Sequence, residues 1–469
     1  MKLKKIRLVK DNYTKLVEPY KEEALRELNN LVEINSVHDE TTVTKTMPFG
    51  KGVDNALEYV ANLGKRLGFN VDRCDNYITE LTYGEGRILD IYAHVDVVPV
   101  KQKDWIHDPF KLTIEKKIMY GRGSADDKGP GIACLYACKA LMDAGKLGGY
   151  KLRFLFGGNE ERGSKCLEHY FHTMKKEYPT FGFSPDSDYP LIYAEKTISS
   201  YIGEYDVDIP CPSFDFGDAL NVVLSETSVS LNIDEKELIK EIAVYEKKYK
   251  DIKIISEGNR VTFVGVPAHG STPYNGVNAG LHLINFLGQV YSLPVLEGIY
   301  NNYVDGRGNK FKGSYSDKVF DGSTYNVGRL SYDNKKKKLS IYVSFRFPAS
   351  YKFEEVIKEI EINTSCKITP LGYSDGYIAD LSSPYVNALL DAYRINTCDF
   401  KTKPLAIGGG TYARESKNSV AFGACFPTRD YKMHGNDEYF PLDDFYANMQ
   451  IYAHAIDLLG LLLNDETKA

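Results

Sequence analysis

The chain has 469 residues, of which 43% are hydrophobic and 26% charged, and its formal net charge is −6. This length predicts two or three domains, and the composition is typical of a globular protein with a buried core. The mild negative charge argues against nucleic acid or an anionic membrane surface as a partner. The N-terminal segment lacks the apolar run of a signal peptide, and no window of about 18 apolar residues occurs, so we expect neither secretion nor membrane spanning.

The eight cysteines form no CxxC pair. In a chain of this length, that pattern is typical of reduced, mostly buried thiols, so we expect a cytoplasmic protein. The only dense basic run, at residues 335–338, lies between an Asp-Asn pair and an alternating apolar segment. We predict a solvent-exposed hairpin turn there, and not a binding patch.

Helices and strands alternate over the first 193 residues. Helical periodicity and apolar runs predict helices over 14–34, 53–68 and 128–145, and strands over 70–82, 88–94 and 151–158. This alternation indicates an α/β sheet with helices on both faces. Sheets of this kind place functional sites at the carboxyl ends of their strands.

The pattern changes after about residue 193, where several strand-like runs precede helices near 279–292 and 353–362. We predict that residues 194–384 form a second, α+β domain inserted into the first. From 385 the earlier pattern returns, and it closes with a long helix over 442–463. The expected fold class is therefore α/β, with 1–193 and 385–469 forming one discontinuous domain around a mixed sheet flanked by helices on both faces.

Three short runs place acidic residues or imidazole at strand or helix ends. His94 and Asp96 end one predicted strand, Glu160-Glu161 follow another, and Asp126-Asp127 precede a helix. Neutral imidazole and carboxylate hold divalent metals, and adjacent glutamates can divide the tasks of ligand and base. Each run alone has a structural interpretation: a buried histidine, or acidic residues near a helix start. Together they indicate hydrolysis by metal-activated water.

Taken in order with other motifs, these runs resemble the co-catalytic di-metal peptidases, the family that includes carboxypeptidase G, aminoacylase and carnosinase. Within it the chain is most similar to the PepV-type bacterial dipeptidases, and the resemblance covers essentially the whole chain. It rests on HxDVVP at 94–99, GRGxxDDKGP at 121–130, Glu-Glu at 160–161, Ser-Pro-Asp at 184–186, GGGTYAR at 408–414 and HxxDE at 434–438.

The resemblance implies two divalent metal ions per chain, Zn²⁺ or Mn²⁺, with Co²⁺ as a further option. The metal ligands that it implies are His94, Asp126, Glu161, Asp186 and His434. Asp126 would bridge both ions, and its peptide bond to Asp127 would be cis. Asp188, two residues after Asp186, is an alternative to it. The pair His169 and His172 also has metal-ligand spacing, but an exposed helix face explains it better.

Glu160 is implied as the general base, and Asp96 as the residue that orients the ring of His94. The charges agree with this scheme, because two divalent ions bring +4, three carboxylates bring −3, and a bridging hydroxide completes the balance. A metal pair can lower the pKa of that water toward ~7. Glu160 would take the proton and pass it to the leaving amine.

The inserted domain carries further implied site residues, and in this family it forms a lid. His269 would donate to the tetrahedral oxyanion. Asn221 and Arg346 would contact the substrate, with a surface strand arginine as the alternative for Arg346. Gly409 and Gly410 would let backbone N–H groups approach the substrate carboxylate, or they merely form a tight turn.

The inserted stretch, residues 194–384, is long enough for a doubled lid, which favours a monomer that supplies its own oxyanion histidine. We therefore predict a metallopeptidase that hydrolyses small peptides, namely dipeptides with free N- and C-termini. An N-acyl-amino-acid deacylase or desuccinylase that uses the same metal site is the alternative.

Overall fold

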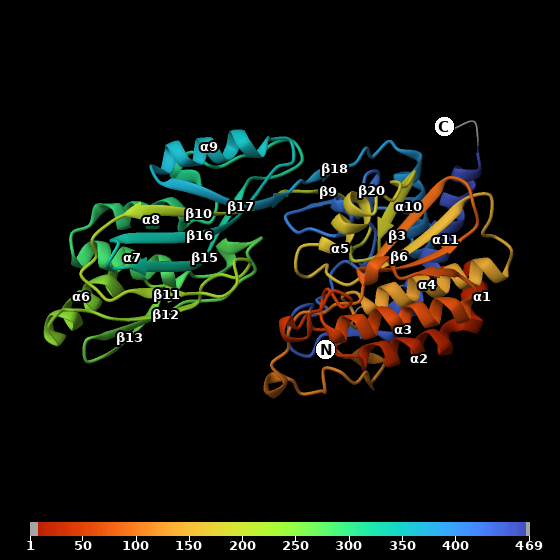
Figure 1. The fold of residues 1–469 in the computed structure, drawn as a ribbon, viewed down its shortest axis with the longest axis horizontal. Helices are drawn as coiled ribbons and strands as arrows, with labels where there is room; N and C mark the ends of the chain where they lie inside the picture. The colour runs from red at the N-terminus through yellow and green to blue at the C-terminus, as the bar shows by residue number, and fades with distance from the viewer. Residues whose placement is uncertain (1–7, 466–469) are drawn as a thin grey trace. The chain divides into compact units, whose positions relative to one another are not determined.

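The computed structural model describes residues 8–465. Their contacts divide the chain into two compact units (Figure 1). The first unit comprises residues 8–193, 379–405 and 411–465, and the inserted unit comprises Ala194–Ile378 and Ala406–Gly410. The inserted unit thus ends before residues 379–384, which the sequence pattern assigned to it, and it gains a short segment after residue 405.

The first unit is built on a mixed sheet. Its strand order is β1 (Asn70–Asp72), β2 (Ile78–Tyr83), β6 (Lys151–Gly157), β3 (Ile88–His94), β7 (Phe181–Ser184), β20 (Ser419–Ala421), β9 (Ile192–Glu195) and β18 (Tyr377–Ile378), and β19 (Leu405–Ile407) also pairs with β9. The central pairs β6–β3, β3–β7 and β7–β20 are parallel, whereas β1–β2 and β2–β6 are antiparallel. Every residue of β3 is buried, as expected for a central parallel strand.

Helices cover both faces of this sheet. The helices of the first unit are α1 (Asn12–Val17), α2 (Lys21–Val32), α3 (Lys51–Leu67), α4 (Lys128–Asp143), α5 (Lys165–Glu168), α10 (Pro384–Thr397) and α11 (Leu442–Asn464). α3 packs against Leu81 and α4 against Phe156. On the opposite face, Tyr170 after α5 lies over Arg153, which has the other parity along β6. The predicted α/β class with a mixed, two-sided sheet is confirmed.

Two predicted elements are each split in the structure. The helix expected over 14–34 becomes α1 and α2, separated by the turn Glu18–Tyr20 that contains Pro19, because proline disrupts a continuous helix. The strand expected over 70–82 becomes β1 and β2, since Cys74, Asp75 and Asn76 adopt positive φ. The long closing helix lies where the periodicity predicted it.

The inserted unit contains two antiparallel sheets. Its five-stranded sheet has the order β11 (Phe214–Phe216), β15 (Thr324–Asp333), β16 (Lys338–Phe347), β10 (Thr197–Asp206) and β17 (Lys367–Ser374). Its three-stranded sheet has the order β12 (Glu226–Ser230), β14 (Arg260–Val264) and β13 (Lys253–Glu257). β15 and β16 form the hairpin that the lysine run predicted.

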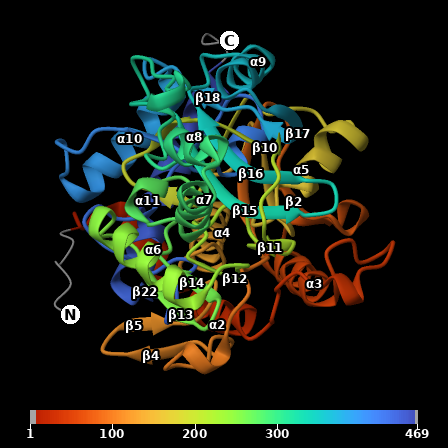
Figure 2. The same cartoon turned by 90° about the vertical axis from the view of Figure 1, so that its left-hand side faces the viewer.

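The helices of the inserted unit are α6 (Glu235–Lys248), α7 (Ala279–Val290), α8 (Pro294–Tyr303) and α9 (Phe353–Thr364). α7 contacts strands of both sheets, and α6 covers the smaller one (Figure 2). One buried cluster joins both sheets, so the inserted unit has its own core. Over residues 8–465, no helix combines the length and apolarity needed to span a membrane.

Candidate metal centre

Four predicted site residues lie where neighbouring parallel strands end. His94 is the last residue of β3, Glu160 and Glu161 follow β6, and Asp186 follows β7. β3 lies between β6 and β7 and pairs in parallel with both. Because the carboxyl ends of parallel strands meet at one edge of a sheet, this topology brings the four side chains together.

Asp126 and His434 come from loops beside a second, smaller sheet of the first unit. Its strands are β22 (Tyr439–Pro441), β5 (Ile118–Tyr120) and β4 (Thr113–Glu115). Asp126 lies between β5 and the start of α4, and His434 precedes β22. Since β5 and β22 pair antiparallel, the two loops lie next to each other. The Asp126–Asp127 peptide bond is cis, as the resemblance implied.

Asp126 connects two groups of potential ligands. Its Oδ1 lies 2.9 Å from Nε2 of His94, and that nitrogen is 3.6 Å from Oδ2 of Asp186. Its Oδ2 lies 2.9 Å from Nε2 of His434, and that nitrogen is 3.1 Å from Oε1 of Glu161. In each group of three, the ligand atoms all lie within 4.8 Å of one another. One carboxylate thus offers a different oxygen to each group.

This donor set fits a pair of divalent cations. Each group combines one imidazole nitrogen with two carboxylates, and the shared Asp126 can bridge. Imidazole and carboxylate suit Zn²⁺ and Mn²⁺, and paired ions in hydrolytic sites lie about 3.5–4 Å apart. The ring of His94 is fully buried and Asp126 is 8% exposed, so both are held firmly before any ion binds.

The pKa shifts reflect carboxylates crowded into a buried space. Burial, together with the charge of Asp186, raises the pKa of Glu160 well above its usual range. Burial and Asp126 raise the pKa of Glu161 to about 7. Burial opposes charge on His434, but its hydrogen bonds to Asp126 and Glu161 raise its pKa to about 11. Protons therefore balance the excess negative charge, a role that divalent cations can take over.

Asp96 contacts the ligand segments through both its main chain and its side chain. Its carbonyl oxygen lies 2.9 Å from Nδ1 of His94, whereas its carboxylate lies 3.6 Å from that nitrogen. The carboxylate accepts hydrogen bonds from the backbone N–H groups of Glu160 at 3.1 Å and Glu161 at 3.2 Å. The backbone of residue 96 thus orients the ring, and its side chain fixes the turn that carries both glutamates.

The sequence model of peptidase family M20/M25/M40 matches residues 91–458. This chain belongs to that family. A proposed dipeptidase of Staphylococcus haemolyticus is 32% identical over 462 residues, which cover 94% of this chain and 97% of the relative. YtjP of Bacillus subtilis, also a proposed dipeptidase, is 32% identical over 457 residues, which cover 93% of this chain and 97% of the relative.

The fold is shared with a solved peptidase structure. The di-peptidase Dug1p of Saccharomyces cerevisiae is 14% identical, with a TM-score of 0.59 over 96% of this chain and 98% of its own. The predicted resemblance to di-metal peptidases is therefore confirmed at the level of the family. With both ligand groups assembled, this member of the M20/M25/M40 family is a metal-dependent peptidase.

In the inserted unit of this M20/M25/M40 peptidase, Asn221 and His269 lie on paired segments. Val222 and His269 form an antiparallel bridge, and Gly270 donates its N–H to the carbonyl of Asn221 at 2.6 Å. The side-chain amide of Asn326 donates to the carbonyls on both sides of Asn221, at 2.7 and 2.8 Å. The two predicted residues therefore belong to one cross-linked piece of backbone.

Arg346 and the glycine run also come together in the inserted unit. Nη1 of Arg346 donates to the carbonyl of Gly408. Gly409 and Gly410 continue the same run, and the contacts place residues 406–410 with the inserted unit. A guanidinium and a row of backbone N–H groups thus share one region, which suits recognition of a carboxylate.

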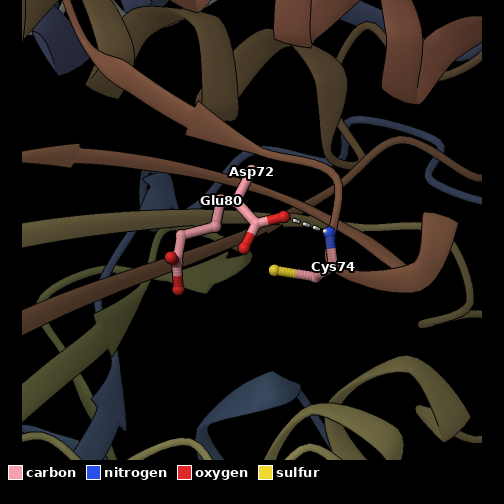
Figure 3. Close-up of side chains that lie close together, drawn as sticks. All are labelled: Asp72, Cys74 and Glu80. Carbon is pink, nitrogen blue, oxygen red and sulfur yellow. Dashed lines mark hydrogen bonds between the residues drawn. The ribbon is translucent and has the colours of Figure 1, made fainter.

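A third group of potential ligands comprises Asp72, Cys74 and Glu80 (Figure 3). Nζ of Lys176 lies 3.5 Å from Asp72 and 3.2 Å from Glu80. The buried thiol has a raised pKa because of that burial, and the nearby charge of Glu80 adds to the rise. Since one ammonium already pairs with both carboxylates and burial favours the protonated thiol, this group is an ion-pair cluster.

Other candidates from the sequence lie outside the metal centre. Asp188 is exposed and belongs to neither ligand group. The ring of His169 stacks on Tyr77 and lies 2.9 Å from the carboxylate of Asp75. His172 is exposed. The structure therefore groups Asp186, and not its near neighbour Asp188, with the other ligands.

The sequence patterns gave no role to Arg122 or Glu438, although both lie within the quoted motifs. The structure pairs them in a buried position, with Nη1 of Arg122 2.6 Å from Oε2 of Glu438. The only hint in the sequence was that the two motifs carry side chains of opposite charge, which can form an ion pair. Their contact joins residues 316 positions apart, and local periodicity gives no information on such a pairing.

Proposed function

We propose that this chain hydrolyses dipeptides whose amino and carboxyl ends are both free, using two divalent cations, Zn²⁺ or Mn²⁺. The observation that carries the proposal is the carboxylate of Asp126, which offers one oxygen to each of two imidazole-containing groups. The two relatives at 32% identity, both proposed dipeptidases, support this substrate class.

The cations are assigned to the two ligand groups that share Asp126. When bound, they supply Lewis-acid activation of water and of the scissile carbonyl. Glu160 takes a proton from the attacking water and delivers it to the leaving nitrogen as the C–N bond breaks. The carboxylate of Glu160 belongs to neither ligand group, so it is left to carry the proton.

In the inserted unit, we assign His269 as the donor to the tetrahedral oxyanion and Asn221 as a substrate contact. Nδ1 of His269 accepts a hydrogen bond from the backbone N–H of Ser271 at 3.3 Å and lies 2.6 Å from Ser271 Oγ, which orients the ring and leaves the N–H donor at Nε2. Arg346, with Gly409 and Gly410, is assigned to the C-terminal carboxylate of the substrate. The length of the insert supports a monomer, and light scattering of the purified protein tests it.

The proposed compartment is the cytoplasm. All eight cysteines are free, and only Cys398 among them is exposed. That pattern is typical of proteins that work under reducing conditions. Fractionation of the native host, with antibody detection of the chain, tests the assignment.

Glu160→Ala should abolish dipeptide turnover and leave the metal content intact, because the carboxylate moves the proton and lies outside both ligand groups. Glu160→Gln, which keeps the shape, should be equally inactive. Amine release measures turnover, and elemental analysis after dialysis measures bound metal. A variant that retains substantial activity contradicts the assignment of the base.

A substrate panel separates the proposed activity from its alternative. Free dipeptides should be hydrolysed in a chelator-sensitive way, with activity restored by Mn²⁺ or Zn²⁺. Hydrolysis of only N-acetyl or N-succinyl amino acids instead indicates a deacylase or desuccinylase.

Arg346→Ala should lower kcat/KM for dipeptides by about 10–100-fold, since a hydrogen-bonded charge contact is lost. Dipeptide amides, which lack the carboxylate, are the matched control and should respond little.

A further inference from the structure

A buried ion pair joins the two loops that carry Asp126 and His434. Oε1 of Glu438 accepts hydrogen bonds from the backbone N–H groups of Ala125 at 2.9 Å and Asp126 at 3.3 Å. Oε2 of Glu438 accepts one from Nη1 of Arg122 at 2.6 Å. Both charged side chains are buried, with Arg122 at 2% and Glu438 at 0% exposure.

Arg122 extends the connection to the other ligand loop. Its Nη2 donates to the carbonyl of Gly435, directly after His434, at 3.0 Å. The guanidinium also lies over the ring of Trp105, 5.1 Å from its centroid. The pair therefore contacts the backbone of the bridging ligand on one side and the backbone next to the imidazole ligand on the other.

The strand pairing behind these loops explains why the contact is possible. Tyr439 of β22 pairs with Tyr120 of β5, and Gly121 donates its N–H to the carbonyl of Glu438 at 3.1 Å. This strand pairing aligns the two segments but ends before either Asp126 or His434. Beyond it, the side chains of Arg122 and Glu438 link the two loops, and His434 itself has positive φ.

We propose that Arg122 and Glu438 form a positioning pair that sets the spacing of Asp126 and His434 and thereby the affinity and geometry of the metal pair. This inference rests on the metal centre of the proposed function. Neither residue belongs to a ligand group, so both act through the backbone of the ligands. Removing such an outer contact typically costs about 10–100-fold in metal affinity.

Glu438→Gln tests the role without changing the side-chain shape. The amide has one acceptor oxygen, so it cannot accept from both Arg122 and the backbone of the Asp126 loop. Mn²⁺ titration of the chelator-treated protein, followed by the free-ion electron paramagnetic resonance signal, should show affinity about 10–100-fold weaker. The spectrum of the loaded protein should change as well, because spin coupling depends on the distance between the two ions.

Asp437→Asn is the matched control on the same loop. Its carboxylate accepts hydrogen bonds from the backbone of Ile106 and His107, at 3.1 and 3.0 Å. It thus ties the loop to residues other than those around Asp126, and asparagine tolerates its positive φ. This variant should keep the parental Mn²⁺ affinity and spectrum. An equal loss in Asp437→Asn overturns the specific role of the pair.

The double variant Arg122→Met with Glu438→Gln covers the case in which the single variant folds poorly. It leaves no unpaired buried charge, a change that often preserves stability. It should melt like the parental apoprotein and still bind Mn²⁺ weakly. Parental affinity in a folded variant overturns the positioning role alone. A parental chain that binds no Mn²⁺, or is unaffected by His434→Ala, contradicts the proposed metal centre instead.

Discussion

The carboxylate of Asp96 accepts hydrogen bonds from the backbone N–H groups of both glutamates that follow β6, so it holds the turn that carries them. Asp96→Ala removes both acceptors, so we expect kcat to fall together with a loss of about 10–100-fold in metal affinity. Asp96→Asn keeps one acceptor oxygen and should be less severe. Steady-state kinetics over a Mn²⁺ series measure both quantities.

Asp188→Ala is the control for this prediction, since Asp188 is an exposed aspartate two residues from a proposed ligand. It should retain parental kinetics. If Asp96→Ala keeps kcat within twofold at saturating Mn²⁺, the two hydrogen bonds to the glutamate turn have no catalytic importance.

Local patterns predicted most helices and strands of the first unit, because the apolar residues of these elements recur at regular spacing. They also placed His94, Asp126 and Glu161 beside the ends of predicted elements, whereas Asp186 and His434 became candidates only through the resemblance to a family. Patterns could not show which distant segments pair. The contacts of Glu438 with Ala125 span 313 positions, and the grouping of residues 406–410 with Arg346 depends on tertiary contacts alone.

The register of β3 on β6 places Asp90 opposite Arg153, where they form a bidentate pair at 2.6 Å. Their side chains are 0% and 3% exposed. Asp90→Asn leaves a buried guanidinium without its counter-charge, so we expect the free energy of unfolding of the first unit to fall by about 3–5 kcal/mol. Denaturant titration followed by circular dichroism measures the change.

The matched control is Asp215→Asn in the inserted unit, whose partner Arg329 forms the same bidentate geometry at 2.8 and 2.6 Å. These side chains are 52% and 39% exposed, and exposed pairs contribute about 0–1 kcal/mol. A comparable loss in both variants would show that burial does not govern the strength of these pairs.

Protons and divalent cations compete for the same side chains of the metal centre. In the chelated protein, the pKa values of His434 and Glu161 are raised to about 11 and about 7. A raised folded pKa stabilises below the unfolded value and is lost as the pH rises through the folded one. The melting temperature of the chelated protein should therefore fall from pH 5 to pH 10.

Metal affinity should change in the opposite direction, because the ligands must release these protons. Calorimetric titration with Mn²⁺ at pH 7 in buffers of different ionisation enthalpy should detect proton release, and His434→Ala should reduce it. Affinity that does not depend on pH contradicts the assignment of His434 as a ligand.

The two units have separate cores, and all five proposed ligands belong to the first. Ligand binding stabilises the part of a protein that binds, by about 2.7 kcal/mol at a free concentration of 100 Kd. In scanning calorimetry, chelation should therefore lower the transition of the first unit and leave that of the inserted unit unchanged. Asp90→Asn identifies the first transition and Asp215→Asn the second. A single transition that shifts as a whole contradicts this expectation and shows that the two units unfold together. Metal bound by the first unit would then also stabilise the fold of the inserted unit, which carries His269 and Arg346.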